Sequence, residues 1–152
     1  MSLRLDPQND PSINDKRKIV KGFYTDTKNT LRMIVTKSSV NGIIQDDTNT
    51  HYTKIKNFNI KKVHYYMIKN FLLSNKKQQY HIVSYNCATF AIAALKAAGM
   101  HVHFKKYFWN IGVPYILYPF LPLTVLAALS SYSLCRGYTP AGIAHDISKG
   151  IV

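Results

Sequence analysis

Residues 80–100 read YHIVSYNCATFAIAALKAAGM, and the interpretation of the whole chain rests on this stretch. Its second half is rich in alanine and contains no glycine or proline before Gly99, a composition typical of a helix interior. Gly99 can adopt the left-handed conformation in which many helices end. We therefore predict a helix from Cys87 to about Ala98, preceded by a short extended segment over residues 80–85.

The predicted helix places Cys87 in its first turn, where a thiol acquires unusual chemistry. Unpaired backbone N–H groups and the helix dipole favour the thiolate there, which lowers the pKa of the thiol and makes it a nucleophile. Asn86 or Ser84 can cap the helix and hold the cysteine in place. The backbone N–H of Cys87 can also donate to the oxyanion of an attacked carbonyl group. The alternative is that Cys87 is a small buried hydrophobic residue at a helix start.

The charge of the chain is strongly positive, since 20 Lys and Arg residues stand against 7 Asp residues and no Glu. A net charge of +13 attracts polyanions such as nucleic acid, anionic lipid or an acidic cell-wall polymer. We find no nucleic-acid-binding motif and therefore expect no specific nucleic-acid partner. The absence of Glu also removes one common general base and metal ligand.

The cysteine and histidine spacing argues against metal chemistry and leaves the cellular compartment open. Cys87 and Cys135 are far apart, and His101 and His103 lie in no recognised zinc-binding spacing, so we expect no metal and no cofactor. The two cysteines can form at most one disulfide. The N-terminus lacks the apolar run of a secretory signal, so export would need another route or a larger parent chain.

The length and composition favour one domain. A chain of 152 residues that is 47% hydrophobic can close one apolar core but not two ordinary ones. Residues 1–18 are polar and contain two prolines, so we expect an irregular lead-in before a single domain over residues 19–152. Short apolar pieces bounded by turn residues predict strands early in this domain. They are Ile19-Val20, Gly22–Tyr24, Leu31–Val35 and Gly42–Ile44.

A second helix is predicted just before the first, because apolar residues recur at spacings of three and four from Ile60 onwards. We expect this helix to end near Ser74. The side chains expected on its buried face are those of Ile60, Val63, His64, Met67, Ile68, Phe71 and Leu72.

The segment from Tyr107 to Cys135 differs from the rest because it contains no charged residue. It is long enough to cross a bilayer, but three prolines argue against one straight span. The helix-prone piece from Leu123 to about Ser133 is too short to span alone. Residues 107–135 therefore form a buried hairpin or core helix, a membrane-contacting insertion, or a true span.

The run from Tyr80 to Ala91, followed by Leu95-Lys96-Ala97-Ala98-Gly99-Met100, resembles the cysteine helix of the circularly permuted NlpC/P60 hydrolases. These belong to the branch of the papain-like superfamily that includes relatives of lecithin:retinol acyltransferase. In that branch an Asn-Cys pair opens the helix, as Asn86 and Cys87 would, and an aromatic residue three positions later packs beneath it, as Phe90 would. The resemblance implies a papain-like α+β fold in which a small antiparallel sheet packs against the helix carrying the cysteine.

The resemblance also implies a thiolate nucleophile, a histidine base on the first strand of the sheet and a third polar residue on the next strand. No histidine precedes His51 in this chain. The base is then His51 in a rearranged sheet, or it lies in a missing N-terminal part, or catalysis is lost. Unpermuted relatives place the histidine after the cysteine, and His145 is the second candidate. His81 lies shortly before Cys87 and can come close to it in space.

These expectations combine into a cysteine hydrolase or acyltransferase that cleaves an amide or ester bond through a thioester acyl-enzyme. The substrates expected are a peptidoglycan peptide or an anionic membrane lipid. Small basic hydrolases of this type resemble bacterial effector toxins, which are exported without a signal peptide, act at the envelope or membrane, and have cognate inhibitors or larger parent chains. The alternative is a non-catalytic binding or membrane-associating module that keeps the fold without a working histidine base.

Overall fold

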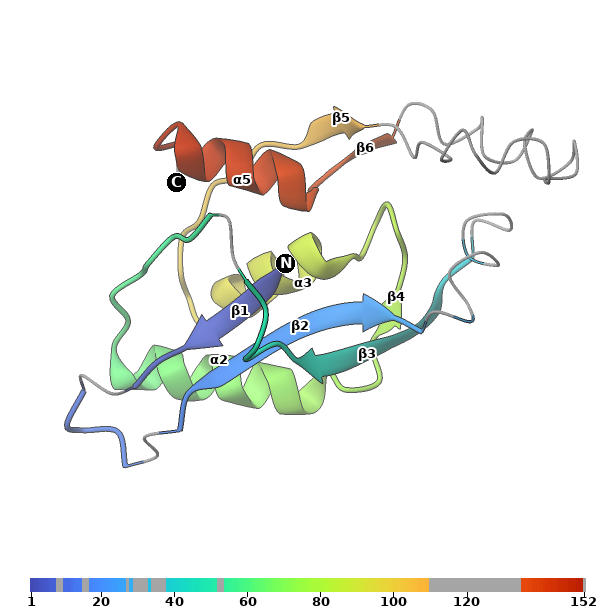
Figure 1. The fold of residues 1–152 in the computed structure, drawn as a ribbon. Coiled ribbons are helices and arrows are strands. Elements are labelled where there is room, and N and C mark those ends of the chain that lie inside the picture. Colours follow the sequence, from blue (N-terminus) through green and yellow to red (C-terminus); the bar gives the residue numbers. More distant parts are fainter. Residues whose placement is uncertain are drawn as a thin grey trace, which may run out of the picture.

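The computed structural model describes most of the chain, namely residues 1–7, 10–14, 17–26, 28, 33, 38–51, 54–109 and 135–151. Within these ranges the protein has an α+β fold with three helices, a four-stranded antiparallel sheet and a small two-stranded sheet (Figure 1). The α+β class and the antiparallel sheet agree with the prediction from sequence.

The four strands of the larger sheet lie side by side in chain order, each antiparallel to the next. They are β1 (Ser2–Leu5), β2 (Ile19–Thr25), β3 (Val40–Asp46) and β4 (Gln79–Tyr80). β2 and β3 contain the apolar pieces that predicted strands over residues 19–24 and 42–44. Most of the predicted piece Leu31–Val35 lies outside the described residues.

The first residues of the chain belong to the sheet, which corrects the expectation of an irregular lead-in over residues 1–18. β1 pairs with β2, and the side chains of Leu3 and Leu5 are only 9% and 3% exposed. Ile13, in the connection to β2, is buried as well. A four-residue strand carries too few alternating side chains to be recognised without its partner.

The helix that carries the cysteine has the predicted limits. α3 spans Cys87–Ala97, with Asn86 as its N-cap and Ala98 as its C-cap. Gly99 follows with φ of 74°, the left-handed conformation expected at the end of a helix. The sequence signals at its two ends, Asn86 and Gly99, therefore predicted the limits of α3.

The helix before it, α2 (Lys62–Ser74), also ends where expected, but its buried face differs from the prediction. Val63 and Met67, both expected on the buried stripe, are 50% and 45% exposed. His64 lies in the first turn, and its Nδ1 accepts a hydrogen bond from the backbone N–H of Lys61 at 3.3 Å. The residues that α2 does bury are Tyr65, Ile68 and Leu72.

Aromatic rings join both helices to the sheet. Phe23 of β2 stacks on Phe90 of α3 with ring centroids 4.6 Å apart, and Phe71 of α2 lies 5.4 Å from Phe90. Gly42 of β3 makes room for this cluster, because a Cβ there would meet the ring of Phe23 and the backbone oxygen of Gln78. Phe90 therefore packs against the sheet beneath the cysteine helix, as the prediction required.

The C-terminal part of the described chain forms the small sheet and a third helix. β5 (Tyr107–Trp109) pairs with β6 (Cys135–Gly137), and α5 (Pro140–Ser148) follows. The alternatives considered for residues 107–135 fall largely on residues 110–134, which lie outside the described ranges. Among the described helices, none combines the length and the apolar character needed to cross a membrane.

Candidate functional site

Cys87 is the first residue of α3, and its thiol is half-buried and not part of a disulfide. The first turn is the positive end of the helix dipole, and its N–H groups have no acceptor within the helix. The location that the sequence predicted for the thiol is therefore the one in which nucleophilic cysteines are found.

Asn86 fixes the start of α3 through both ends of its side-chain amide. Its Oδ1 accepts hydrogen bonds from the backbone N–H groups of Ala88 at 2.9 Å and Thr89 at 3.1 Å. Its Nδ2 donates to the backbone carbonyl oxygens of Ile82 at 2.9 Å and Tyr138 at 3.0 Å. Asn86 is only 4% exposed. The helix start is thus held to the turn before it and to the segment that precedes α5.

The hydroxyl group of Tyr80, at the end of β4, lies against the same helix start. The backbone N–H of Cys87 donates a hydrogen bond to it, so the N–H expected to serve an oxyanion is bonded to Tyr80 in this structure. Burial, followed by the charge of Cys87, raises the pKa of Tyr80 to about 12, although the N–H donor acts in the opposite direction. Tyr80 therefore keeps its proton at neutral pH and can donate a hydrogen bond.

A second polar group forms around Asp47, which is only 6% exposed. The hydroxyl of Tyr24 donates to Oδ2 of Asp47 at 2.6 Å, and the hydroxyl of Ser2 donates to the same oxygen. Gly22 permits this approach, because a Cβ there would overlap the Asp47 carboxylate. Burial and the hydrogen bond to Asp47 raise the pKa of Tyr24 to about 12, and the charge of Cys87 adds to this shift.

Tyr24 and Asp47 come from neighbouring parts of the larger sheet. Tyr24 lies on β2, the first strand predicted from the sequence, and Asp47 directly follows β3, the next one. A phenol with a pKa of about 12 is protonated at neutral pH, so it can donate a hydrogen bond but cannot act as a general base there. Sequence reasoning missed both residues and Ser2, because only the pairing of β1, β2 and β3 brings them together.

His51, the first candidate for the base, is exposed and makes no hydrogen bond or ion pair with another described residue. It lines a cavity of about 630 Å³ that Tyr24 and Ser2 also line. Ala91, one turn after Cys87 on α3, contributes to the same wall. The structure thus brings His51 and Tyr24 to one cavity, whose lining includes Ala91 of the cysteine helix but not Cys87 itself.

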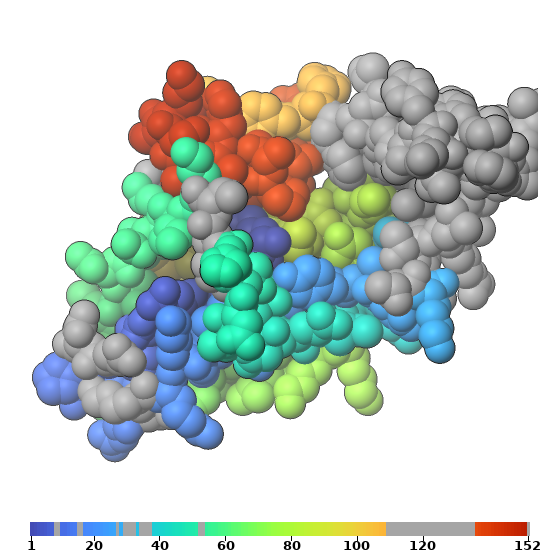
Figure 2. All heavy atoms as spheres, in the orientation of Figure 1, coloured from blue at the N-terminus to red at the C-terminus, as the bar shows by residue number. Residues whose placement is uncertain are grey.

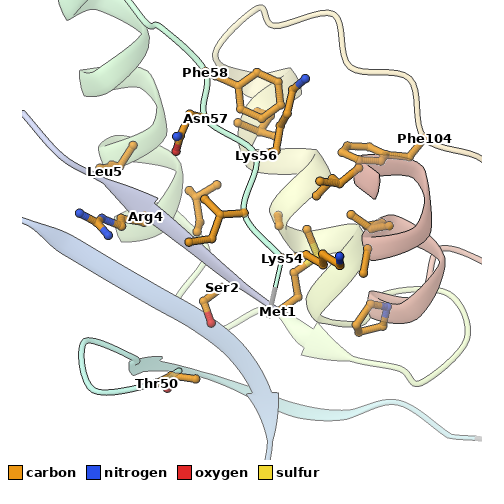
Figure 3. A pocket seen from close by; sticks show the side chains of 18 of the residues that line it. Met1, Ser2, Arg4, Leu5, Thr50, Lys54, Lys56, Asn57, Phe58 and Phe104 are labelled. Atoms are coloured by element: carbon orange, nitrogen blue, oxygen red, sulfur yellow. The ribbon is translucent and has the colours of Figure 1, made fainter. Parts of the chain in front are cut away.

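The cavity has mostly apolar walls and several basic side chains. β1, the 54–60 segment, α3 and α5 surround it, and Figure 3 shows side chains from these parts converging on it. In Figure 2, the N-terminal strand (dark blue), the 54–60 segment (green) and α5 (red) meet on one face. Its basic lining residues are Arg4, His51, Lys54 and Lys56. An apolar group attached to an anionic or polar head would match this lining.

His81 stabilises the turn that leads into α3. Its Nδ1 accepts hydrogen bonds from the backbone N–H groups of Val83 at 3.2 Å and Ser84 at 3.1 Å, and it forms an isolated bridge with Tyr85. Residues 82–84 are therefore a turn, which corrects the extended segment expected over residues 80–85. Ser84 belongs to this turn and leaves the capping of α3 to Asn86.

His145, the second candidate for the base, lies on α5 with its side chain 54% exposed. Its Nδ1 is 3.1 Å from the hydroxyl oxygen of Tyr107 and 3.8 Å from Oδ1 of Asp146. Asp146 is fully buried and accepts hydrogen bonds from Tyr107 and from the backbone N–H of Lys105. Burial raises the pKa of Asp146, but these hydrogen bonds outweigh it and keep the pKa below its ordinary value. None of these contacts involves Cys87.

Within the described ranges, no three His, Cys or Asp side chains are grouped so that they could hold a metal ion. Comparisons of the chain with protein-family models, with curated proteins and with solved structures found no match. The argument for function therefore rests on the residues around Cys87.

Proposed function

We propose that the protein is a cysteine hydrolase or acyltransferase in which Cys87 attacks an amide or ester carbonyl. The observation that carries this proposal is the free, half-buried thiol at the first position of α3, held there by the four hydrogen bonds of the buried Asn86 side chain. A nucleophile must be oriented toward its substrate, and the bonds of Asn86 support the proposal because they hold the residue that carries the thiol in one position.

The reaction would proceed through a thioester. The sulfur of Cys87 bonds to the carbonyl carbon while its proton passes to a base, and the carbonyl oxygen becomes an oxyanion. Tyr80 keeps its proton at neutral pH, so its hydroxyl group can donate a hydrogen bond to that oxyanion. The alcohol or amine then leaves with a proton from the base, and water or another acceptor releases the acyl group from Cys87.

His51 is our first candidate for the base, because it lines the same cavity as Tyr24 and histidine is the commonest general base in proteins. His145 remains the second candidate. The cavity between β1, the 54–60 segment and α5 would take the apolar part of the substrate. A lipid acyl ester and a peptidoglycan peptide are the two substrate classes that we propose, in the setting of an exported bacterial effector with a cognate inhibitor or a larger parent chain.

The proposal is tested by the rate at which iodoacetamide alkylates Cys87 as a function of pH, read by mass spectrometry. We expect Cys87 to react well below the pH at which an ordinary thiol ionises, about 8.5. The His51→Ala variant should lose this advantage, whereas His145→Ala should keep it. Cys135 in the same protein is the internal reference. If Cys87 and Cys135 react alike in the parent chain, the proposal of a catalytic thiol is wrong.

One observation favours a second candidate, a non-catalytic binding or membrane-associating module. The ionisable side chains whose pKa values respond to Cys87 are Tyr24 and Tyr80, and both have a pKa of about 12. Neither phenol can hold a thiol proton at neutral pH. A Cys87→Ala variant with the parent hydrolysis of p-nitrophenyl acetate, or with full biological activity, would favour this module. Loss of both with an unchanged circular dichroism spectrum would favour the enzyme.

A further inference from the structure

The outward side of α2 carries large apolar side chains that are exposed to solvent. Val63, Met67 and Leu73 are 50%, 45% and 54% exposed. The helix buries Tyr65, Ile68 and Leu72 on its other side, so large apolar side chains lie on both sides of it. A helix at the surface of a globular domain ordinarily places polar residues on its outward side. In Figure 2 the atoms of α2 (light green) protrude along the lower edge of the molecule.

A positively charged groove lies beside this apolar surface, between α2 and the strands β2 and β3. Its volume is about 640 Å³. Ile43 and Leu73, which are 38% and 54% exposed, contribute apolar surface to it. Its charged lining residues are Arg17, Lys18, Lys21, Lys69, Lys76 and Asp46. The lining thus has five cationic side chains and one carboxylate, that of Asp46, which pairs with Lys21 at 3.0 Å, so positive charge is in excess.

We propose that this surface, formed by Val63, Met67, Leu73 and Ile43 and the cations of the groove, docks the protein on an anionic phospholipid bilayer. Exposed aliphatic side chains can enter the boundary between headgroups and acyl chains, while lysines remain at the level of the phosphates. The net charge of +13 adds long-range attraction to an anionic surface. The surface lies on α2 and the sheet, so docking does not depend on residues 107–135.

The chemistry of the surface favours lipid over two other partners, single-stranded nucleic acid and a second copy of the chain. Single-stranded nucleic acid is bound by aromatic side chains that stack on bases, and the exposed residues here are aliphatic. A second copy of the chain would bring one excess of positive charge against another, which is unfavourable. A bilayer supplies both the negative charge and the apolar phase that this combination requires.

The experiment is sedimentation of the full chain with vesicles of phosphatidylcholine alone and with vesicles of equimolar phosphatidylcholine and phosphatidylglycerol. The parent protein should sediment with the anionic vesicles only. The Met67→Ser/Leu73→Ser variant changes two exposed side chains and should bind about tenfold more weakly. The Lys18→Gln/Lys76→Gln variant should lose binding to a similar extent, which tests the surface without altering its apolar residues.

Two controls make the outcome decisive. Phe108→Ser changes a side chain that is 66% exposed on β5, at the start of the 107–135 segment, and should bind like the parent. Loss of binding in Phe108→Ser with full binding in both α2-groove variants would overturn the proposal. Displacement from vesicles by a short oligonucleotide together with undiminished binding in Met67→Ser/Leu73→Ser would also overturn it, because the attraction would then be purely electrostatic. Cys87→Ala should bind vesicles normally, so failure of the proposed enzyme would not affect this result.

Discussion

Asn86 joins three separate stretches of the chain at the start of α3. It caps the helix with its side-chain oxygen, and its side-chain nitrogen bonds to the carbonyl oxygens of Ile82 and Tyr138. An asparagine suits this position better than serine or aspartate, because its amide can donate two hydrogen bonds while accepting two, whereas a hydroxyl has one proton to donate and a carboxylate has none. In the proposed enzyme, Asn86 would therefore act as a positioning residue for Cys87.

We predict that Asn86→Ala lowers the free energy of unfolding by about 2–4 kcal/mol, because the cap is lost and two partly buried carbonyl oxygens lose their donor. Urea denaturation followed by circular dichroism measures this change. Asn75→Ala is a matched control at the end of α2, where the side chain donates only to Phe71 at 2.9 Å and is partly exposed. Equal losses in the two variants would contradict the role assigned to Asn86.

A second prediction at this scale concerns alkaline pH. The pKa values of Tyr24 and Tyr80 are raised from 10.0 to about 12, so the folded state keeps protons that the unfolded chain releases. Their contribution to stability is therefore complete below pH 10 and is lost as pH rises toward 12. Tyr80→Phe removes one of the two groups and should flatten this decline. A decline as steep as that of the parent, measured by denaturation at several pH values, would contradict the assignment.

At the scale of secondary-structure elements, sequence signals predicted the limits of helices better than their packing. Gly99 and the Asn86-Cys87 pair determined both ends of α3 because caps act locally. The prediction for the buried face of α2 was right for Ile68 and Leu72. It was wrong for Val63 and Met67, because an apolar pattern ranks these two above Tyr65, which is the residue buried in the core. Which face is buried depends on the elements opposite, and a single helix sequence does not contain them.

The close contact between Gly42 of β3 and the aromatic core gives a prediction for the stability of this part of the sheet. A Cβ at Gly42 would meet the ring of Phe23 and the backbone oxygen of Gln78, which cannot move away as a flexible side chain can. We expect Gly42→Ala to lower the free energy of unfolding by about 1–3 kcal/mol. Asn41→Ala, at the exposed neighbouring position, is the control and should change it by less than about 0.5 kcal/mol. Thermal denaturation of both variants tests this difference.

At the scale of the molecule, the charge of +13 acts on the folded state as a whole. Like charges held close together repel, and salt screens them over a distance of about 10 Å at 0.1 M. We predict that the Tm rises when sodium chloride is added at neutral pH, as measured by differential scanning calorimetry. A Tm that falls with added salt would show that the ion pairs Arg4–Asp6 and Lys21–Asp46 outweigh the general repulsion.

The candidate site was predictable only in the part that is local in sequence. Cys87 and Asn86 were recognised because they are neighbours at a helix start. Tyr24, Asp47 and Ser2 were not, because their contact requires the pairing of three strands that are distant in the chain. The role of His51 as base remains a prediction, since exposure and a place on the cavity wall do not by themselves make a base.

The hydrogen bond from Asn86 to the carbonyl oxygen of Tyr138 also means that movement at one of these residues affects the other. It couples the position of the thiol to that of the segment before α5, although the two are far apart in the chain. A partner that draws Tyr138 away from α3 would break one of the bonds that orient the sulfur. The same coupling works in reverse, so acylation of Cys87 that disturbs Asn86 would loosen the C-terminal segment. The alkylation rate of Cys87 would therefore report any movement of the segment that contains Tyr138.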